Sequence, residues 1–135
     1  CFAALGVVAG LWSLHGGWRV HPYYLDYYNE LCGGTAAVAR RHLFEIGWWG
    51  EGLGAATRFV DRVAPRGARV KVMVTPRHVI ELRPDLVWTE DNDSAEFIVY
   101  NELLNPPLRV PRHRVVFVVR ADGAPLAWVY QRNDR

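Results

Sequence analysis

Asp91 and Asp93, which flank Asn92, are the residues of this sequence whose spacing comes closest to a metal site. Two carboxylates one residue apart at the edge of a strand could hold a divalent cation on the diphosphate of a sugar nucleotide. The same short pattern is common in polar loops, and the acidic run 90–93 stands just before an expected strand. We therefore interpret the run as a loop and keep Asp91 and Asp93 as secondary candidates for a metal site.

The other residue types that perform catalysis form no recognisable arrangement. The histidines show neither HxH nor HxxxH spacing, and neither serine lies in a G-x-S-x-G motif. The two cysteines form no CxxC pair, so we expect neither a disulfide nor a zinc site. The histidines, serines and cysteines of the chain are His15, His21, His42, His78, His113, Ser13, Ser94, Cys1 and Cys32. The sequence therefore predicts no catalytic residue and no cofactor.

A glycine-rich stretch surrounds two tryptophans and a glutamate just before a predicted helix. It consists of Gly47, Trp48, Trp49, Gly50, Glu51, Gly52 and Gly54. Glycines at the start of a helix can let backbone amides face an anion such as a phosphate. The spacing matches neither the Walker nor the dinucleotide motif. We favour a tight turn that is packed by the tryptophan rings.

The segment 21–34, HPYYLDYYNELCGG, contains four tyrosines and ends in a Gly-Gly pair. Aromatic rings with one polar tip favour places where one side is apolar and the other is wet, such as a membrane interface. We predict that this segment is an interfacial collar with a short amphipathic helix, and that its tyrosines serve packing and anchoring rather than ligand contact. Shortly after it, the run 40–42 could touch phosphate headgroups or form a solvated helix face.

The segment 1–18 before the collar carries no formal charge. A complete membrane span needs about 20 predominantly apolar residues. We therefore predict that residues 1–20 are the C-terminal part of a transmembrane helix that begins upstream. Trp12, Trp18 and Arg19 would mark its exit into the headgroup region. The alternative is a helix buried in a soluble domain.

The remainder, 35–135, is predicted to form one α/β (α+β) domain with helices packed on a small mixed or antiparallel sheet. Thr35 is the expected N-cap of a helix over 35–47, and a second amphipathic helix ends at Pro65. Other expected elements are strands at 68–76 and 95–103, a short helix at 77–82, and a final β-hairpin around 121–125. The chain has 16 basic and 14 acidic residues, a balance that argues against nucleic-acid binding.

The run 21–53 resembles the segment that follows the last membrane helix in a family of bacterial glycosyltransferases. These are integral-membrane enzymes of the dolichyl-phosphate-mannose–protein mannosyltransferase type, also described as aminoarabinose-transferase-like. The resemblance covers about residues 15–60. The matching residues are His21, Pro22, Tyr23, Tyr24, Tyr28, Asn29, Gly33, Gly34, Trp49, Gly50, Glu51, Gly52 and Leu53.

The resemblance implies that this chain is the C-terminal extracytoplasmic tail domain of such an enzyme, with residues after about 20 outside the cell membrane. The parent would transfer a sugar from a polyprenyl-phosphate donor, and its catalytic carboxylate would lie upstream of this chain. The matching residues would hold the tail against the membrane-facing body or line the acceptor side, with membrane lipid as a partner. Two alternatives stay open: a membrane-tethered, non-catalytic module that binds glycan or protein, and a soluble sugar-nucleotide enzyme that uses Asp91 and Asp93.

Overall fold

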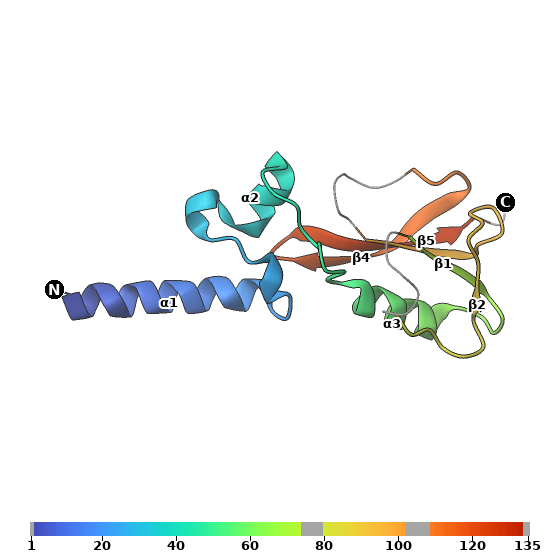
Figure 1. Cartoon of the computed structure of the whole chain (residues 1–135), viewed down its shortest axis with the longest axis horizontal. Helices are drawn as coiled ribbons and strands as arrows, with labels where there is room; N and C mark the ends of the chain where they lie inside the picture. The colour runs from blue at the N-terminus through green and yellow to red at the C-terminus, as the bar shows by residue number, and fades with distance from the viewer. Residues whose placement is uncertain (1, 74–79, 102–108, 134–135) are drawn as a thin grey trace.

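The computed structural model describes residues 2–73, 80–101 and 109–133, and its centre is a five-stranded mixed sheet (Figure 1). The strands are β1 Arg69–Met73, β2 Val87–Trp88, β3 Phe97–Asn101, β4 His113–Ala121 and β5 Ala124–Arg132. Their order is β2-β1-β3-β5-β4. β1 runs parallel to β2 and β3, whereas β5 is antiparallel to both β3 and β4. The predicted mixed sheet and terminal hairpin are confirmed.

The hairpin forms because the sequence between β4 and β5 suits a tight turn. Asp122 and Gly123 both have positive φ angles, 46° and 79°. Two consecutive residues of this kind give a turn whose twist matches that of the flanking strands, and Asp-Gly is a favoured pair for it. The register then places Ala121 opposite Ala124.

One face of the sheet is covered by α3, Leu53–Val63, as the sequence predicted (Figure 1). Its buried residues Leu53, Ala56 and Val60 recur at three- and four-residue spacing, which places them on one side of the helix. They pack against buried strand residues such as Phe97 and Val129. A second cluster of buried residues, including Ile98 and Trp128, lies elsewhere on the sheet.

The chain before α3 consists of α1 Phe2–Val20, two single-turn 3₁₀ helices, Tyr24–Asp26 and Glu30–Cys32, and α2 Gly34–Arg41. α1 projects away from the sheet (Figure 1). Its residues 2–15 are all exposed, so the interpretation of a buried helix is wrong for this part of the chain. Within the residues that the structure describes, no helix is both long and apolar enough to cross a membrane.

A third cluster of buried residues joins α1 to the domain. Val20, at the end of α1, packs with Val38 of α2 and with Leu126 of β5. All three side chains are buried. Arg19 also forms an ion pair with Asp122 in the hairpin turn, at 2.5 Å. The base of α1 is therefore part of the folded domain.

Several local predictions are wrong, and the reasons are specific. The collar forms no amphipathic helix, because hydrogen bonds to residues outside it, described below, hold its backbone in two separate turns. α2 stops at Arg41, where His42 adopts a left-handed conformation with φ of 51°. Thr35 is not its N-cap, since Gly33 occupies that position. The two-residue strand β2 was not predicted.

Parts of three predicted elements lie outside the described residues. These are residues 74–76 of the first strand, 102–103 of the strand predicted at 95–103, and 77–79 of the short helix. The described remainder of that short helix, 80–82, has no regular secondary structure.

Gly52 is a position where the fold requires glycine, and this can be tested. Its φ is 84°, and a methyl group added there would lie 3.0 Å from Leu126 Cβ and 3.1 Å from Val119 Cγ1. We expect Gly52→Ala to lower the free energy of unfolding by about 1–3 kcal/mol, because it combines backbone strain with overpacking.

Gly54→Ala is the matched control, because Gly54 lies in α3 and a methyl group there would meet only Arg58 Nη1, at 3.5 Å. It should leave stability unchanged or raise it by up to about 1 kcal/mol, as alanine favours helix. Urea denaturation followed by circular dichroism measures both. Equal effects at the two positions would contradict the packing described for Gly52.

Candidate functional site

The collar, residues 21–34, bends back along α1 instead of continuing away from it. Trp12 Nε1 of α1 donates a hydrogen bond to Glu30 Oε2 at 2.7 Å, and the Tyr27 hydroxyl donates to the same oxygen at 3.3 Å. Gly16 makes this approach possible, because a methyl group there would lie 2.6 Å from the Tyr27 hydroxyl. The collar thus contacts α1 one to two turns before the helix ends.

Several predicted site residues of the collar face solvent. His21 and Tyr24 are exposed, and His21 Nδ1 lies 2.5 Å from the Tyr24 hydroxyl. The His21 ring also stacks on Trp18, with 6.3 Å between ring centroids. Pro22 follows in an exposed turn. The rings of Trp18, His21 and Tyr24 form an exposed aromatic surface at the base of α1, and their anchoring role stays a prediction.

The other predicted collar residues support the backbone. Asn29 Oδ1 accepts a hydrogen bond from Cys32 N at 3.2 Å and so caps the second 3₁₀ helix. Gly33 and Gly34 have φ angles of 87° and 75°, which let the chain reverse into α2. Tyr28 donates through its hydroxyl to the Glu45 carbonyl at 2.8 Å. These contacts are structural.

The residue that fixes the collar to the domain is Asp26, which the sequence analysis did not single out. Its side chain is 3% exposed, and Oδ1 accepts a hydrogen bond from Gly47 N at 2.6 Å. Asn101 Nδ2 of β3 donates to the carbonyl of the same glycine at 2.9 Å. The backbone of Gly47 is therefore held by the collar at its N–H and by the sheet at its carbonyl.

Thr35 completes the junction between the collar and the domain, which Asp26, Gly47 and Asn101 form. Its hydroxyl donates to the Asp26 carbonyl at 2.7 Å and accepts a hydrogen bond from Tyr28 N at 3.3 Å. Within the described part of the chain, Asp26 Oδ2 and Asn101 Oδ1 are buried without a hydrogen-bond partner. Such atoms carry a desolvation cost that nothing described here offsets. The junction is thus tightly placed but incompletely satisfied.

The environment of Asp26 changes its acidity. Burial raises the pKa of Asp26 to about 6, the hydrogen bond from Gly47 N acts in the opposite direction, and the negative charge of Glu51 adds to the rise. The carboxyl group holds its proton more tightly in the folded chain than in the unfolded one. Its contribution to stability is therefore lost as the pH rises through about 4 to 6.

The predicted residues Trp49, Gly50, Glu51 and Gly52 follow this junction directly. Trp49 N donates to Glu51 Oε2 at 2.9 Å, and Gly50 N donates to the Gly47 carbonyl at 3.0 Å. The expectation of a turn packed by tryptophan rings is wrong, since Trp48 and Trp49 are 58% and 78% exposed. The turn is instead held by backbone hydrogen bonds, which leave both rings available.

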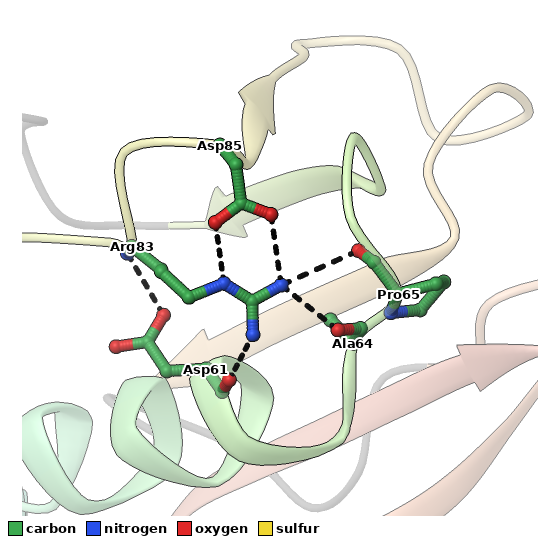
Figure 2. Close-up of polar contacts among 5 residues, drawn as sticks. All are labelled: Asp61, Ala64, Pro65, Arg83 and Asp85. Atoms are coloured by element: carbon green, nitrogen blue, oxygen red, sulfur yellow. Dashed lines mark hydrogen bonds and ion pairs between the residues drawn. The ribbon is translucent and has the colours of Figure 1, made fainter.

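A cleft of about 620 Å³ begins at Trp49 and follows α3. Its second wall is formed by residues 80–83. Figure 2 shows how Arg83 fastens that wall to α3: its backbone N–H donates to Asp61 Oδ1 at 2.9 Å, and its guanidinium donates to Asp85 Oδ2 at 3.0 Å and to the Ala64 carbonyl at 2.9 Å. The Arg83 guanidinium also holds the pKa of Asp85 below its usual value.

Asp91 and Asp93 lie in an exposed turn and do not line the cleft. The Asp91 carboxylate accepts hydrogen bonds from Asp93 N at 3.1 Å and Ser94 N at 3.0 Å. A hydrogen bond from the Ser94 side chain lowers the pKa of Asp91 most, and these backbone bonds lower it further. Among the described residues, no three His, Cys, Asp or Glu side chains are grouped to hold a metal ion. The geometry is that of a polar turn, as the loop interpretation predicts.

No protein-family model matches this chain, and neither a curated protein nor a solved structure matches it significantly.

The acidity of Asp26 gives a test of the junction. Asp26→Asn keeps the size of the side chain and an acceptor for Gly47 N but removes the charge. In the unchanged chain we expect Asp26 to contribute a fall of about 2 kcal/mol in the free energy of unfolding between about pH 4.5 and pH 7.5. Urea titrations at the two pH values measure the free energy of unfolding. Its change between these pH values should be smaller in the variant by the contribution of Asp26.

Glu45→Gln is the control, because Glu45 is an exposed carboxylate of the segment that leads from α2 to Gly47. Its pH dependence should stay that of the unchanged chain. An Asp26→Asn variant with the same pH dependence as the Glu45→Gln variant would contradict the buried position of Asp26.

Proposed function

We propose that this chain is the C-terminal, membrane-attached tail domain of a polytopic glycosyltransferase. The parent enzyme would transfer a sugar from a polyprenyl-phosphate donor to an acceptor. Its general base would be a carboxylate upstream of this chain. The observation that carries the proposal is the exposed part of α1, residues 2–15, which carries no formally charged side chain. The helix is fixed to an α+β domain next to the collar, the segment whose sequence resembles those enzymes.

The exposed hydrophobic side chains of α1 favour an apolar environment around the helix. Its large hydrophobic side chains recur on all sides: Phe2, Leu5, Val7, Val8, Leu11, Trp12, Leu14 and Trp18. A helix that is hydrophobic all round is typically buried in protein or in lipid. Each such side chain gains about 1.5–3 kcal/mol when it is removed from water. Lipid or neighbouring membrane helices would supply that burial.

Polar groups beside α1 indicate how far the apolar environment would extend. Glu30 lies against Trp12, and Arg19 is paired with Asp122 at the end of the helix. Carboxylates and guanidinium groups are costly in the hydrocarbon region. We therefore place residues 2–11 in the membrane and the Trp12 indole at its interface. The collar would then lie in the headgroup layer, where tyrosine and tryptophan are common.

The matching residues have mainly positioning roles in this proposal. Asn29, Gly33 and Gly34 shape the collar, and Glu51 holds the turn at Trp49. None of them is assigned a catalytic role. The chain would keep a water-exposed domain at a fixed height above the membrane, next to the body that carries out the reaction.

A second candidate is a membrane-tethered module that binds a glycan or a protein and has no chemistry of its own. The exposed rings of Trp48 and Trp49 favour it, because aromatic side chains are common anchors in binding sites. Both candidates share membrane attachment. They differ in whether the gene product transfers sugar.

Membrane attachment through α1 can be tested on the full chain by flotation with phospholipid vesicles. We expect the chain to float with the vesicles and Leu5→Arg to lower the bound-to-free ratio at least about tenfold, because an arginine in the helix centre costs roughly 2.5–3.5 kcal/mol. Val63→Arg is the control, since Val63 is an exposed apolar residue of α3. Loss of flotation in both variants, or in neither, would contradict attachment through α1.

Sugar transfer can be tested in membranes that contain the gene product carrying this chain. With polyprenyl-phosphate sugars as donors, we expect transfer to an acceptor, and a loss of at least about tenfold when the product is truncated before His21, because the tail positions the acceptor side. Blotting and protease protection would confirm insertion of both forms. A correctly inserted product that transfers no sugar from any donor would support the binding module instead.

A further inference from the structure

The cleft along α3 has the features of a binding site rather than of a gap in the packing. Trp49 lies at one end, Arg58 and Thr57 project from α3, and Glu81 comes from the opposite wall. Its volume of about 620 Å³ is within the range of small-molecule sites. The two walls are joined by the Arg83 contacts shown in Figure 2, so their separation is fixed.

Trp49 is presented at the cleft in a defined position. Its backbone N–H is bound by Glu51, and Leu53 N donates to the Gly50 carbonyl at 3.1 Å. Gly50 has a φ of 82°, and a methyl group there would lie 2.9 Å from Leu53 Cδ1. The backbone on both sides of Trp49 is therefore constrained, while the ring itself is 78% exposed. An exposed ring on a constrained backbone can receive a ligand at a low ordering cost.

The polar groups of the cleft offer both donors and acceptors with balanced charge. Arg58 and Glu81 have no hydrogen-bond or ion-pair partner among the described residues. The Thr57 hydroxyl is buried and donates to the Leu53 carbonyl at 3.0 Å, so it is satisfied within α3. Of the remaining charged groups, the Asp61 carboxylate accepts the backbone N–H of Arg83, and the Arg83 guanidinium pairs with the Asp85 carboxylate. Within the described part of the chain, a ligand in this cleft therefore meets an unpaired guanidinium, an unpaired carboxylate and an aromatic face.

We propose that this cleft binds a neutral carbohydrate, with one sugar ring packed on the Trp49 indole and its hydroxyls hydrogen-bonded to Arg58 and Glu81. A sugar ring has an apolar face of C–H groups and a rim of hydroxyls that both donate and accept. The indole matches the apolar face. The guanidinium donates only, and the carboxylate accepts only, so the pair satisfies both functions of vicinal hydroxyls.

Two other ligand classes fit less well. A phosphate would face two carboxylates, and the guanidinium of Arg83 is already occupied by Asp85, Ala64 and Asp61. A lipid chain would leave the charged groups of Arg58 and Glu81 buried without partners, which is costly. The inference goes beyond the proposed function. It requires neither membrane attachment nor sugar transfer by the parent enzyme.

The test is calorimetric titration of the full chain, kept in a polyoxyethylene detergent that has no sugar headgroup. The probes are maltotriose, α-1,6-mannotriose, globotriose and inorganic phosphate. At least one trisaccharide should bind with a Kd of roughly 0.1–10 mM. Trp49→Ala should weaken that binding at least about tenfold, which corresponds to about 1.4 kcal/mol. Arg58→Gln should weaken it at least about fivefold.

Trp48→Ala is the matched control, because Trp48 is also an exposed tryptophan but does not line the cleft. It should bind the trisaccharide within about twofold of the unchanged chain. Circular dichroism would show that the variants are folded, as expected for exposed side chains. A glycolipid with the same trisaccharide headgroup, offered in vesicles, would show whether a lipid-linked source binds as the free sugar does.

Three results would overturn the carbohydrate assignment: no trisaccharide binding at about 20 mM, equal losses in Trp48→Ala and Trp49→Ala, or tighter binding of phosphate than of any trisaccharide. A fourth is a Trp49→Ala variant that loses flotation with plain vesicles but keeps sugar binding, which would make the ring a membrane anchor. Flotation of Leu5→Arg tests only the membrane attachment, so the two proposals fail separately.

Discussion

The structure depends on one buried contact, in which the backbone N–H and C=O of Gly47 are held by two side chains from distant parts of the chain. Asp26 binds its N–H at 2.6 Å, and Asn101 binds its carbonyl at 2.9 Å. The first side chain belongs to the collar and the second to a central strand. Without this contact, the collar would be joined to the sheet chiefly by the small cluster around Val20 and Leu126. The contact therefore places α1 relative to the domain.

The parts of the fold that could be predicted from the sequence are those set by local patterns. The helix with its buried face of Leu53, Ala56 and Val60 and the hairpin at Asp122-Gly123 were both expected, because side-chain periodicity and turn chemistry act over a few residues. β2 pairs only Val87 and Trp88 with β1, which is too short to leave a pattern. The collar was mistaken for a helix because its conformation depends on Asp26 and Thr35 contacts made elsewhere.

In the candidate site, too, residues set by local patterns could be predicted, and residues that act through distant contacts could not. The aromatic and glycine residues of the collar and of the turn at Trp49 stood out by composition, and they do lie at the surface or in reversals of the chain. Asp26 and Arg83 did not stand out, since a single carboxylate among tyrosines and a single arginine in a loop are unremarkable. Asp26 matters because of a residue 21 positions away, and Arg83 because of Asp61, 22 positions away. Only tertiary structure reveals such pairs.

The turn from Gly47 to Gly52 links the collar to the cleft along α3. Its first residue is bound by Asp26 of the collar, and the Gly47 carbonyl also accepts the N–H of Gly50 at 3.0 Å. Trp49 lies between these points and at the mouth of the cleft. A displacement of the collar would therefore move the Trp49 backbone, and a ligand that fixes Trp49 would restrain the collar in turn, since coupling between two sites is reciprocal. One short segment thus contacts both the collar and the cleft.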